Sequence, residues 1–357
     1  MGETLDKAAT KRPSPEVVVI IGSGPAAWTA AVYAARANLR PLVFEGEPTR
    51  TMIPGGQLMF TTDIENYPGF PRAITGPELM EWMREQALRF GAEAISENIV
   101  DVDLSTHPFT LKPSYSQPVQ AITVVVATGA NANWLDVPNE ERLAHSGGGV
   151  SACAVCDAAL PAYRDKVLAV VGGGDTAMEE ALYTTKFSKE TLVIHRRNAF
   201  RASPIMAERV LNNPKIRVLW NKRVIEVLGY DQITGLRLED TVTAAIEDVD
   251  VGGMFVAIGH SPNTEFLRGQ LELTPHGYVK TKPLRTATSV SGVFAAGDVM
   301  DDYYRQAVTA AGMGCMAALE AERWLAHHGV GESPMLETAD AATHTQAWQV
   351  RAAGGGA

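Results

Sequence analysis

Residues 17–45 read VVVIIGSGPAAWTAAVYAARANLRPLVFE, and this stretch decides the fold of the first part of the chain. The β-branched apolar run over residues 17–21 predicts a strand. The Ala-rich segment over residues 28–39 has helical character, and the apolar run over residues 41–44 predicts a second strand. Strand, helix and strand in this order form a β-α-β unit, which favours an α/β fold.

The turn between the first strand and the helix has the glycine pattern of a dinucleotide site. Gly22 allows the tight turn, Gly24 lets the backbone approach a pyrophosphate, and the small Ala27 allows the helix to pack closely on the strand. The phosphates would lie at the helix N-terminus, where free N–H groups favour negative charge. Glu45, which follows the second strand, is placed to accept hydrogen bonds from ribose hydroxyls.

A second copy of this arrangement begins at residue 167, where the chain reads VLAVVGGGDTAMEEALYTTKFSKETLVIHRR. Residues 167–171 predict a strand, residues 172–177 a glycine turn, residues 178–187 a helix and residues 191–195 the second strand. The chain therefore carries two dinucleotide-type units about 150 residues apart, which is a duplication of architecture.

The second unit ends on basic residues where the first ends on a carboxylate. His195, Arg196 and Arg197 close the unit, and Arg201 follows four residues after Arg197. A carboxylate at this position would repel a 2′-phosphate, whereas guanidinium groups bind it bidentately. The basic turn therefore favours NADPH over NADH in the second unit.

Two further apolar strands end in small-residue turns and predict where the chain passes between domains. One strand leads into Thr128 and Gly129, and the other leads into Gly259. Residues from about 262 onward would return to the first domain and end in a helix over residues 305–327.

The sequence therefore predicts an α/β protein with two Rossmann-like dinucleotide-binding domains, the second inserted into the first. Polar termini without apolar periodicity are expected to be disordered. The expected boundaries are a disordered N-terminal extension over 1–15, the first domain over 16–129 and 259–328, the inserted domain over 130–258, and a disordered tail over 329–357.

A Cys-x-x-Cys pair, Cys153 and Cys156, lies inside the predicted inserted domain. A zinc site needs four ligands, and neither a second Cys-x-x-Cys nor a suitably spaced His pair occurs. A pair on a turn leading into a helix gains a lowered thiol pKa, which dithiol exchange requires. Asp157 follows directly, either as a helix N-cap or as a proton donor to a departing thiolate. Cys315, on an apolar helix, is expected to be a core residue.

Composition excludes several classes of function. The net charge of −10 argues against a nucleic-acid partner, which requires clustered Lys and Arg. No apolar run approaches the roughly 18 residues that a membrane span requires. The start of the chain, with acidic residues and no apolar stretch, does not resemble a secretory signal. Three cysteines do not make a secreted disulfide framework. We expect a cytoplasmic protein, with an organellar location as the alternative, and no metal site.

Taken together, these residues resemble the low-molecular-weight NADPH-dependent thioredoxin reductases from about residue 16 to 327. A Cys-x-x-Cys pair inside the NADPH domain is distinctive of that family. The motifs that carry the resemblance are GSGPAAWTAAVYAARANLRP, PGGQLMFTTDIENYPGF, ATGANANWL, SACAVCD, GGGDTAMEEALY, HRRNAFRAS, FVAIGHSPNT and GVFAAGDVMDDYYRQA.

The resemblance implies that FAD binds the first domain and NADPH the inserted one. The residues implied to hold FAD are Gly22, Ser23, Gly24, Pro25, Ala26 and Glu45 at its adenosine diphosphate half, Gly56, Gln57, Leu58 and Asn66 along the flavin, and Asp298, Arg305, Gln306 and Ala307 at the ribityl and isoalloxazine side. The residues implied to hold NADPH are Gly174, Asp175 and Thr176 at the pyrophosphate, with His195, Arg196, Arg197 and Arg201 at the 2′-phosphate. Thr128, Gly129 and Gly297 are also expected to bind cofactor.

The resemblance also implies the catalytic roles. Cys156 matches the cysteine nearer the flavin, Cys153 would attack the thioredoxin disulfide, and Asp157 would serve as acid/base. One position departs from the family, because Ala158 stands where the family usually has glycine. A methyl group at that turn is expected to tilt the dithiol or to alter the fit of the partner.

The expected activity is reduction of thioredoxin by NADPH through FAD and the cysteine pair. Thioredoxin would be a separate protein, and the resemblance implies a homodimer. The alternative enzyme is a flavin-dependent dithiol oxidase of the same fold acting on a small molecule, and the basic residues at 195–197 and 201 argue against it. A flavin-binding redox sensor without catalysis is the other alternative; it would show negligible NADPH oxidation.

Overall fold

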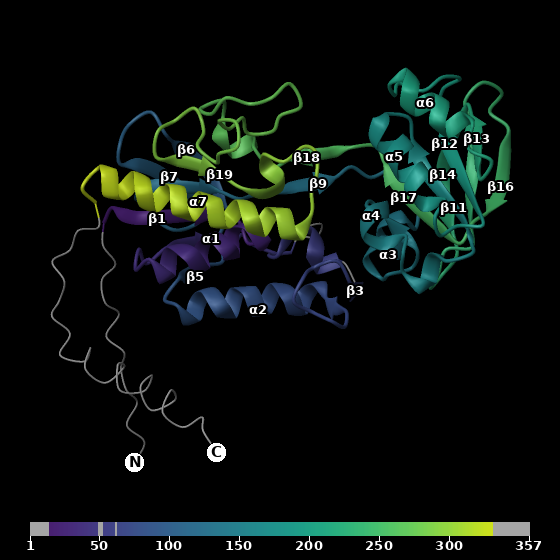
Figure 1. Ribbon diagram of the computed structural model, residues 1–357. Helices are drawn as coiled ribbons and strands as arrows, with labels where there is room; N and C mark the ends of the chain where they lie inside the picture. The colour runs from purple at the N-terminus through teal and green to yellow at the C-terminus, as the bar shows by residue number, and fades with distance from the viewer. Residues whose placement is uncertain (1–13, 49–52, 61–62, 331–357) are drawn as a thin grey trace, which may run out of the picture.

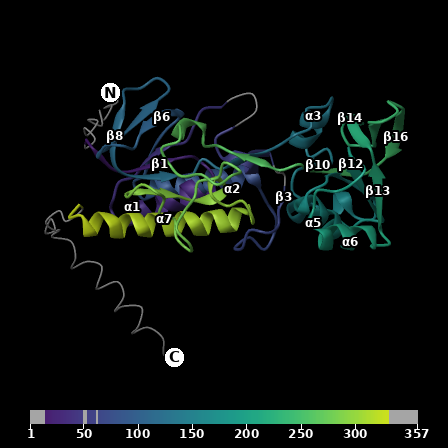
Figure 2. The ribbon, with the colours of Figure 1, turned by 90° about the horizontal axis from the view of Figure 1, so that it is seen from above.

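The computed structural model describes residues 14–48, 53–60 and 63–330. Two α/β units lie side by side and are joined by the strands β9 (Ala130–Ala132) and β18 (His260–Pro262), as Figures 1 and 2 show from two directions. The predicted extension over residues 1–13 and the predicted tail over residues 331–357 lie outside the described residues.

The first unit is built on a seven-stranded sheet in the order β5-β2-β1-β8-β7-β6, with β19 also paired to β8. β7 pairs antiparallel with the start of β8, and β19 pairs in parallel with its end, where Val293 lies opposite Val124. The strands of this sheet are β1 (Glu16–Ile21), β2 (Leu42–Phe44), β5 (Glu93–Ile95), β6 (Ile99–Asp103), β7 (Phe109–Pro113), β8 (Val119–Val126) and β19 (Val293–Ala295). Segments far apart in the sequence therefore share one sheet.

The second unit has a five-stranded parallel sheet in the order β10-β17-β11-β12-β13. A three-stranded antiparallel sheet, β14-β15-β16, lies beside it. The strands are β10 (Val150–Ser151), β11 (Val167–Gly172), β12 (Glu190–His195), β13 (Ile216–Trp220), β14 (Lys222–Leu228), β15 (Gly235–Asp240), β16 (Ile246–Asp250) and β17 (Gly253–Ala257). All of them fall between β9 and β18 in sequence, so the predicted fold of two Rossmann-like units, one inserted in the other, is confirmed. The exact domain boundaries stay predictions.

Helices cover both sheets. They are α1 (Pro25–Arg36), α2 (Gly76–Arg89), α3 (Glu140–His145), α4 (Ala154–Asp157), α5 (Asp175–Thr184), α6 (Pro204–Leu211) and α7 (Ala307–His327). The remaining short elements are the 3-10 turns η1 (Gly56–Phe60), η2 (Pro161–Tyr163), η3 (Glu265–Leu267) and η4 (Gly297–Val299), and the strand pair β3 (Asp63–Ile64) and β4 (Ile74–Thr75).

α1 and α5 both begin three residues earlier than the sequence pattern predicts. Gly24 and Gly174 are the N-cap residues, each with an extended backbone, and proline occupies the first turn of α1. The first three residues, Pro-Ala-Ala in α1 and Asp-Thr-Ala in α5, carry no clear apolar period, although proline at a helix start is favourable. Each helix N-terminus therefore lies within its glycine turn.

The core of the first unit is alanine-rich where α1 packs against α7. A Cβ atom added at Gly314 of α7 would lie 2.1 Å from the carbonyl oxygen of Ala26. This close approach packs α7, at Gly314, against the start of α1.

The two units are connected by a paired ribbon and touch through side chains. β9 and β18 pair antiparallel, with Ser261 opposite Asn131. Gly129 and Gly259, each just ahead of its strand, have φ angles of +69° and +103°. Beyond the ribbon, Phe60 of the first unit stacks on His145 of the second, with ring centroids 4.1 Å apart.

Candidate active site

The two cysteines of the Cys-x-x-Cys motif form a disulfide at the start of α4. Cys153 is the N-cap residue, and its Sγ lies 3.2 Å from the backbone nitrogen of Cys156. The hydroxyl of Ser151 accepts a hydrogen bond from the backbone N–H of Cys153 at 3.0 Å. The helix N-terminus therefore directs N–H groups at a sulfur atom, which stabilises a thiolate once the pair is reduced.

Asp157 is the last residue of α4, so its interpretation as an N-cap is wrong. Its carboxyl accepts a hydrogen bond of 2.5 Å from the hydroxyl of Ser151. Burial raises the pKa of Asp157, although the Ser151 hydrogen bond acts in the opposite direction. A buried carboxyl with a raised pKa next to two cysteines can hold and release a proton there.

Ala158 is compatible with the turn in which it stands. Its backbone has right-handed helical angles, φ −62° and ψ −20°, which alanine adopts without strain. Its methyl group is fully buried in a cluster with Ala154 and Tyr163. The structure gives no geometric reason for the methyl to tilt the cysteine pair.

The disulfide faces the first unit. Gln306, the N-cap of α7, has its amide atoms 3.9 Å from Sγ of Cys156 and 4.0 Å from Sγ of Cys153. The amide of Asn66 donates to Oε1 of Gln306 at 3.4 Å. Residues separated by up to 240 positions in the sequence thus meet at the sulfur atoms.

The first glycine turn depends on Gly22. Its φ is +128°, and an added Cβ would lie 2.1 Å from the carbonyl oxygen of Ala127. Gly24 has open space around it, which leaves its backbone accessible. The hydroxyl of Ser23 accepts from the N–H of Gly55 at 2.9 Å, which ties the segment before Gly56 to this turn.

Glu45 follows β2 and is held by two partners. Nε of Arg84 donates to its carboxylate at 2.8 Å, and the hydroxyl of Ser96 donates at 2.6 Å. Burial alone would raise the pKa of Glu45, but these hydrogen bonds outweigh it and lower the pKa. Glu45 is therefore an ionised, fixed acceptor at neutral pH.

The second glycine turn repeats the close approach of the first. An added Cβ at Gly172 would lie 2.4 Å from the carbonyl oxygen of Ala257, whereas Gly174 has open space. The carboxylate of Asp175 accepts from the N–H and the hydroxyl of Ser203, at 2.9 and 2.7 Å. Asp175 therefore binds the segment that follows the basic turn.

The members of the predicted basic set differ in charge. The ring of His195 is buried, lies over Gly173 and is 2.9 Å from the carbonyl oxygen of Ala199. Burial lowers its pKa, so His195 adds no positive charge at neutral pH. Arg196 and Arg197 are exposed.

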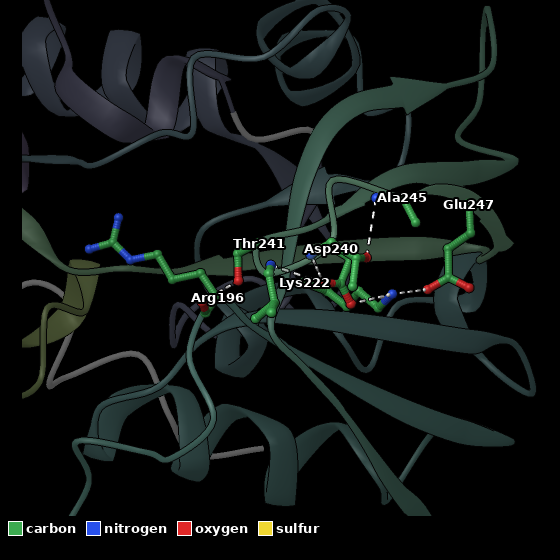
Figure 3. Close-up of polar contacts among 8 residues, drawn as sticks. Arg196, Lys222, Asp240, Thr241, Ala245 and Glu247 are labelled. Carbon is green, nitrogen blue, oxygen red and sulfur yellow. Dashed lines mark hydrogen bonds and ion pairs between the residues drawn. The ribbon is translucent and has the colours of Figure 1, made fainter.

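A neighbouring turn fixes the backbone of Arg196 and Arg197. The hydroxyl of Thr241 donates to the carbonyl of Arg196 at 3.1 Å, and the N–H of Asn221 donates to the carbonyl of Arg197 at 3.2 Å. Lys222 lies between two carboxylates that steady this turn, those of Asp240 at 3.1 Å and Glu247 at 2.8 Å. Figure 3 shows the guanidinium of Arg196 extending away from this network. The backbone is fixed while the charged group remains available to a ligand.

Comparison with known proteins places this site in a family. The profile of the pyridine nucleotide-disulphide oxidoreductases matches residues 16–314. The chain belongs to this family.

Similar pyridine nucleotide-disulphide oxidoreductases include a mitochondrial thioredoxin reductase 1 from Arabidopsis thaliana, 53% identical over 87% of this chain and 84% of the relative. A thioredoxin reductase from Mycolicibacterium smegmatis is also 53% identical, over 87% of this chain and 96% of the relative. The solved structure of thioredoxin reductase from Giardia duodenalis superposes with a TM-score of 0.81 at 41% identity, over 87% of this chain and 98% of that one.

Membership of the pyridine nucleotide-disulphide oxidoreductases implies the use of a flavin and a pyridine nucleotide, and two orphaned polar atoms in the first unit fit a bound group. Oδ1 of Asp298 and Nδ1 of His260 are buried without a partner among the described residues. The positive charge of Arg305 acts to lower the pKa of both side chains. Burial and the nearby Asp301 raise the pKa of Asp298 to about 7. Hydroxyl and amide groups of a ligand would satisfy such atoms.

Two predicted cofactor residues, Thr128 and Gln57, form hydrogen bonds with asparagines in or beside the ribbon. The hydroxyl of Thr128 donates to the carbonyl of Asn263 at 2.7 Å, and the amide of Asn263 donates to the carbonyl of Thr128 at 2.9 Å. Gln57 reaches Asn131 of the ribbon at 3.5 Å. The cofactor roles of Thr128 and Gln57 stay predictions.

The sequence reasoning missed several residues of this pyridine nucleotide-disulphide oxidoreductase site. Ser151 and Ser203 each bind a predicted site carboxylate, and Thr241 holds the basic turn. A serine two residues before a Cys-x-x-Cys motif, or a threonine in a distant turn, has no sequence pattern that separates it from other serines and threonines. Among the described residues, no cluster of His, Cys, Asp or Glu could hold a metal, and no helix is long and apolar enough to cross a membrane.

Proposed function

We propose that the chain is an NADPH-dependent thioredoxin reductase. The observation that carries the proposal is the contact of the Cys153–Cys156 disulfide with Gln306, because it places a redox pair of the inserted unit against the first unit. The names of the similar proteins support thioredoxin as the substrate. The dithiol oxidase alternative has no comparable support, because Arg196 and Arg197 suit a 2′-phosphate.

FAD would bind the first unit and NADPH the inserted unit. Gly24 and Glu45 would hold the adenosine diphosphate half of FAD, and Asp298 and Gln306 would lie toward the flavin. Bound FAD supplies two-electron transfer between the pyridine nucleotide and the cysteine pair. The overall reaction takes a hydride from NADPH and a proton from water, and converts the thioredoxin disulfide to a dithiol.

The chain's own residues would perform the thiol exchange. The thiolate of Cys153 attacks the thioredoxin disulfide, forms a mixed disulfide and displaces one thioredoxin thiolate. Cys156 then attacks Sγ of Cys153, which releases the second thioredoxin thiolate and restores the Cys153–Cys156 disulfide. Asp157, whose pKa is raised by burial, would supply a proton to a departing thiolate.

The two units would rotate between half-reactions. The cysteines and the proposed NADPH site both belong to the inserted unit, so they approach the first unit in turn. The ribbon of β9 and β18, with Gly129 and Gly259 at its ends, supports a hinge there. We further propose a homodimer in the cytoplasm, on the resemblance to this family.

The test is a Cys153→Ser variant, with Cys315→Ser as its control. We expect Cys153→Ser to retain bleaching of the flavin by NADPH in a stopped-flow trace and to lose NADPH-dependent reduction of thioredoxin. Cys315 lies on α7, away from the disulfide, so its variant should keep both. Thioredoxin turnover by Cys153→Ser contradicts the assignment of the nucleophile, and a protein that does not bleach contradicts the whole proposal.

A further inference from the structure

A second carboxyl group lies behind the disulfide. Glu180, in the second turn of α5, is 8% exposed, whereas its neighbour Glu179 is exposed. The backbone of Ala154, the first residue of α4, lies beside one carboxyl oxygen of Glu180 and favours the ionised form of that carboxyl. Its other oxygen, Oε2, is buried and has no partner among the described residues. Glu180 therefore connects α5 to the short helix that carries the cysteines.

The surroundings of Glu180 are apolar except for three charged groups. The adjoining hydrophobic cluster draws buried residues from α4, η2, α5, α6, β11, β12 and β17 and includes Ala154, Ala177 and Phe255. The charged groups that act on Glu180 are Asp157 of α4, Arg305 ahead of α7 and Glu179 of its own helix. Tyr163 faces Asp157 in turn.

A buried carboxyl in such surroundings resists ionisation. Burial raises the pKa of Glu180 to about 7, against the opposing effects of the Ala154 backbone and Arg305. Asp157 ends α4 and Glu180 binds its start, so two buried carboxyls flank the four residues from Ala154 to Asp157. Neighbouring sites of this kind titrate as a coupled system.

We infer that Glu180 is a positioning residue for the redox pair, which anchors the start of α4 and sets the protonation of Asp157 and of the reduced cysteines. This inference rests on the proposed function, because it requires Cys153 and Cys156 to cycle between disulfide and dithiol. When Glu180 is neutral, it exerts no charge repulsion on a cysteine thiolate. Ionised Glu180 adds a negative charge behind the cysteines and disfavours the thiolate.

The test compares the pH dependence of thiol alkylation in the full-length, FAD-loaded protein. All variants carry Cys315→Ser, are reduced chemically and are treated with iodoacetamide between pH 5 and 9. Glu180→Gln keeps a carbonyl oxygen for Ala154 but cannot ionise. We expect the alkylation rate at pH 8 to rise about threefold to tenfold and the inflection that Glu180 contributes near pH 7 to disappear.

Glu179→Gln is the matched control, because it removes the same charge from an exposed position on the same helix. Its profile should match that of the parent. A Glu180→Gln profile equal to the parent's overturns the inference. Asp157→Asn alone and combined with Glu180→Gln completes a double-mutant cycle, and strictly additive changes in the profile overturn the coupling.

The outcomes separate this inference from the proposed function. If thioredoxin is reduced normally and Glu180→Gln leaves alkylation unchanged, the inference fails and the proposed function stands. If thioredoxin is not a substrate but the alkylation profile shifts, the proposed substrate fails while the role of Glu180 at the cysteine pair stands. An unchanged flavin spectrum in Glu180→Gln shows that the first unit is intact.

Discussion

The glycine turns after β1 and β11 pack in the same way against a neighbouring carbonyl. The residues that follow the second strand of each unit, however, have opposite charges. In both, the first glycine packs against a carbonyl at the end of a neighbouring strand, that of Ala127, just after β8, for Gly22 and that of Ala257, the last residue of β17, for Gly172. Glu45 follows the second strand of the first unit, whereas His195 ends the second strand of the other unit and two arginines follow it. Backbone packing therefore fixes where a nucleotide can bind, and the residue after the second strand selects which one.

The two turns also differ in backbone strain. Gly22 has a φ of +128°, a region that other residues rarely adopt, whereas Gly172 has no left-handed φ and is crowded only by contacts. The first turn should therefore tolerate substitution less well than the second.

The largest effect should come from Gly22→Ala. A methyl group there meets a backbone oxygen and forces alanine into a strained conformation, so we expect a loss of at least about 3 kcal/mol in the free energy of unfolding. Gly172→Ala, with the contact alone, should lose about 1–3 kcal/mol. Thermal unfolding measures both, and Gly24→Ala is the control because its surroundings are open. Equal losses at Gly22 and Gly172 would remove the distinction between the two turns.

The next largest effect should come from the charged residues that follow the second strand of the inserted unit. Arg197→Ala should raise the KM for NADPH about 10-fold to 100-fold and leave the KM for NADH unchanged, because a charge-assisted hydrogen bond contributes about 1.5–3 kcal/mol. Steady-state kinetics with both nucleotides measures the ratio. The flavin content serves as the control, since the first turn is untouched. An unchanged preference for NADPH would show that the basic turn does not select the nucleotide.

The smallest effect should appear at Glu45 as a dependence on pH. The pKa of Glu45 is lowered in the folded protein, so its stabilisation is present above the unfolded pKa near 4.5 and is lost as the pH falls through the folded value. Glu45→Gln should cost about 1 kcal/mol at pH 7, and the difference from the parent should shrink below about pH 4.5. Chemical denaturation at several pH values measures it. A difference that does not change with pH would mean that the carboxylate charge contributes nothing.

The fold could be predicted from the sequence because each unit begins with an apolar strand and a glycine turn. These local patterns report the strands and the duplication directly, whereas no local pattern predicts that β19 pairs with β8. The starts of α1 and α5 could not be placed by pattern, because they begin with Pro-Ala-Ala and Asp-Thr-Ala rather than with a periodic apolar stripe.

The site could be predicted only in outline. Cys153, Cys156 and the arginines stand in motifs, but the neutral state of His195 depends on burial beneath its neighbours. The place of Asp157 at the end of α4, and its bond to Ser151, depend on where a four-residue helix begins. Glu180 looks like any helical glutamate in the sequence, and only the tertiary structure distinguishes it from Glu179.

The ribbon of β9 and β18 limits how the two units can move. Strands bonded in register, and reinforced by Asn263 and Ser261, cannot slide past each other without losing those bonds. Rotation about the long axis of the ribbon preserves those hydrogen bonds. Gly129 and Gly259 are the positions whose backbone torsions would change. On the proposed rotation, the inserted unit would therefore turn essentially about one axis, and the stack of Phe60 on His145 would mark one end of that turn.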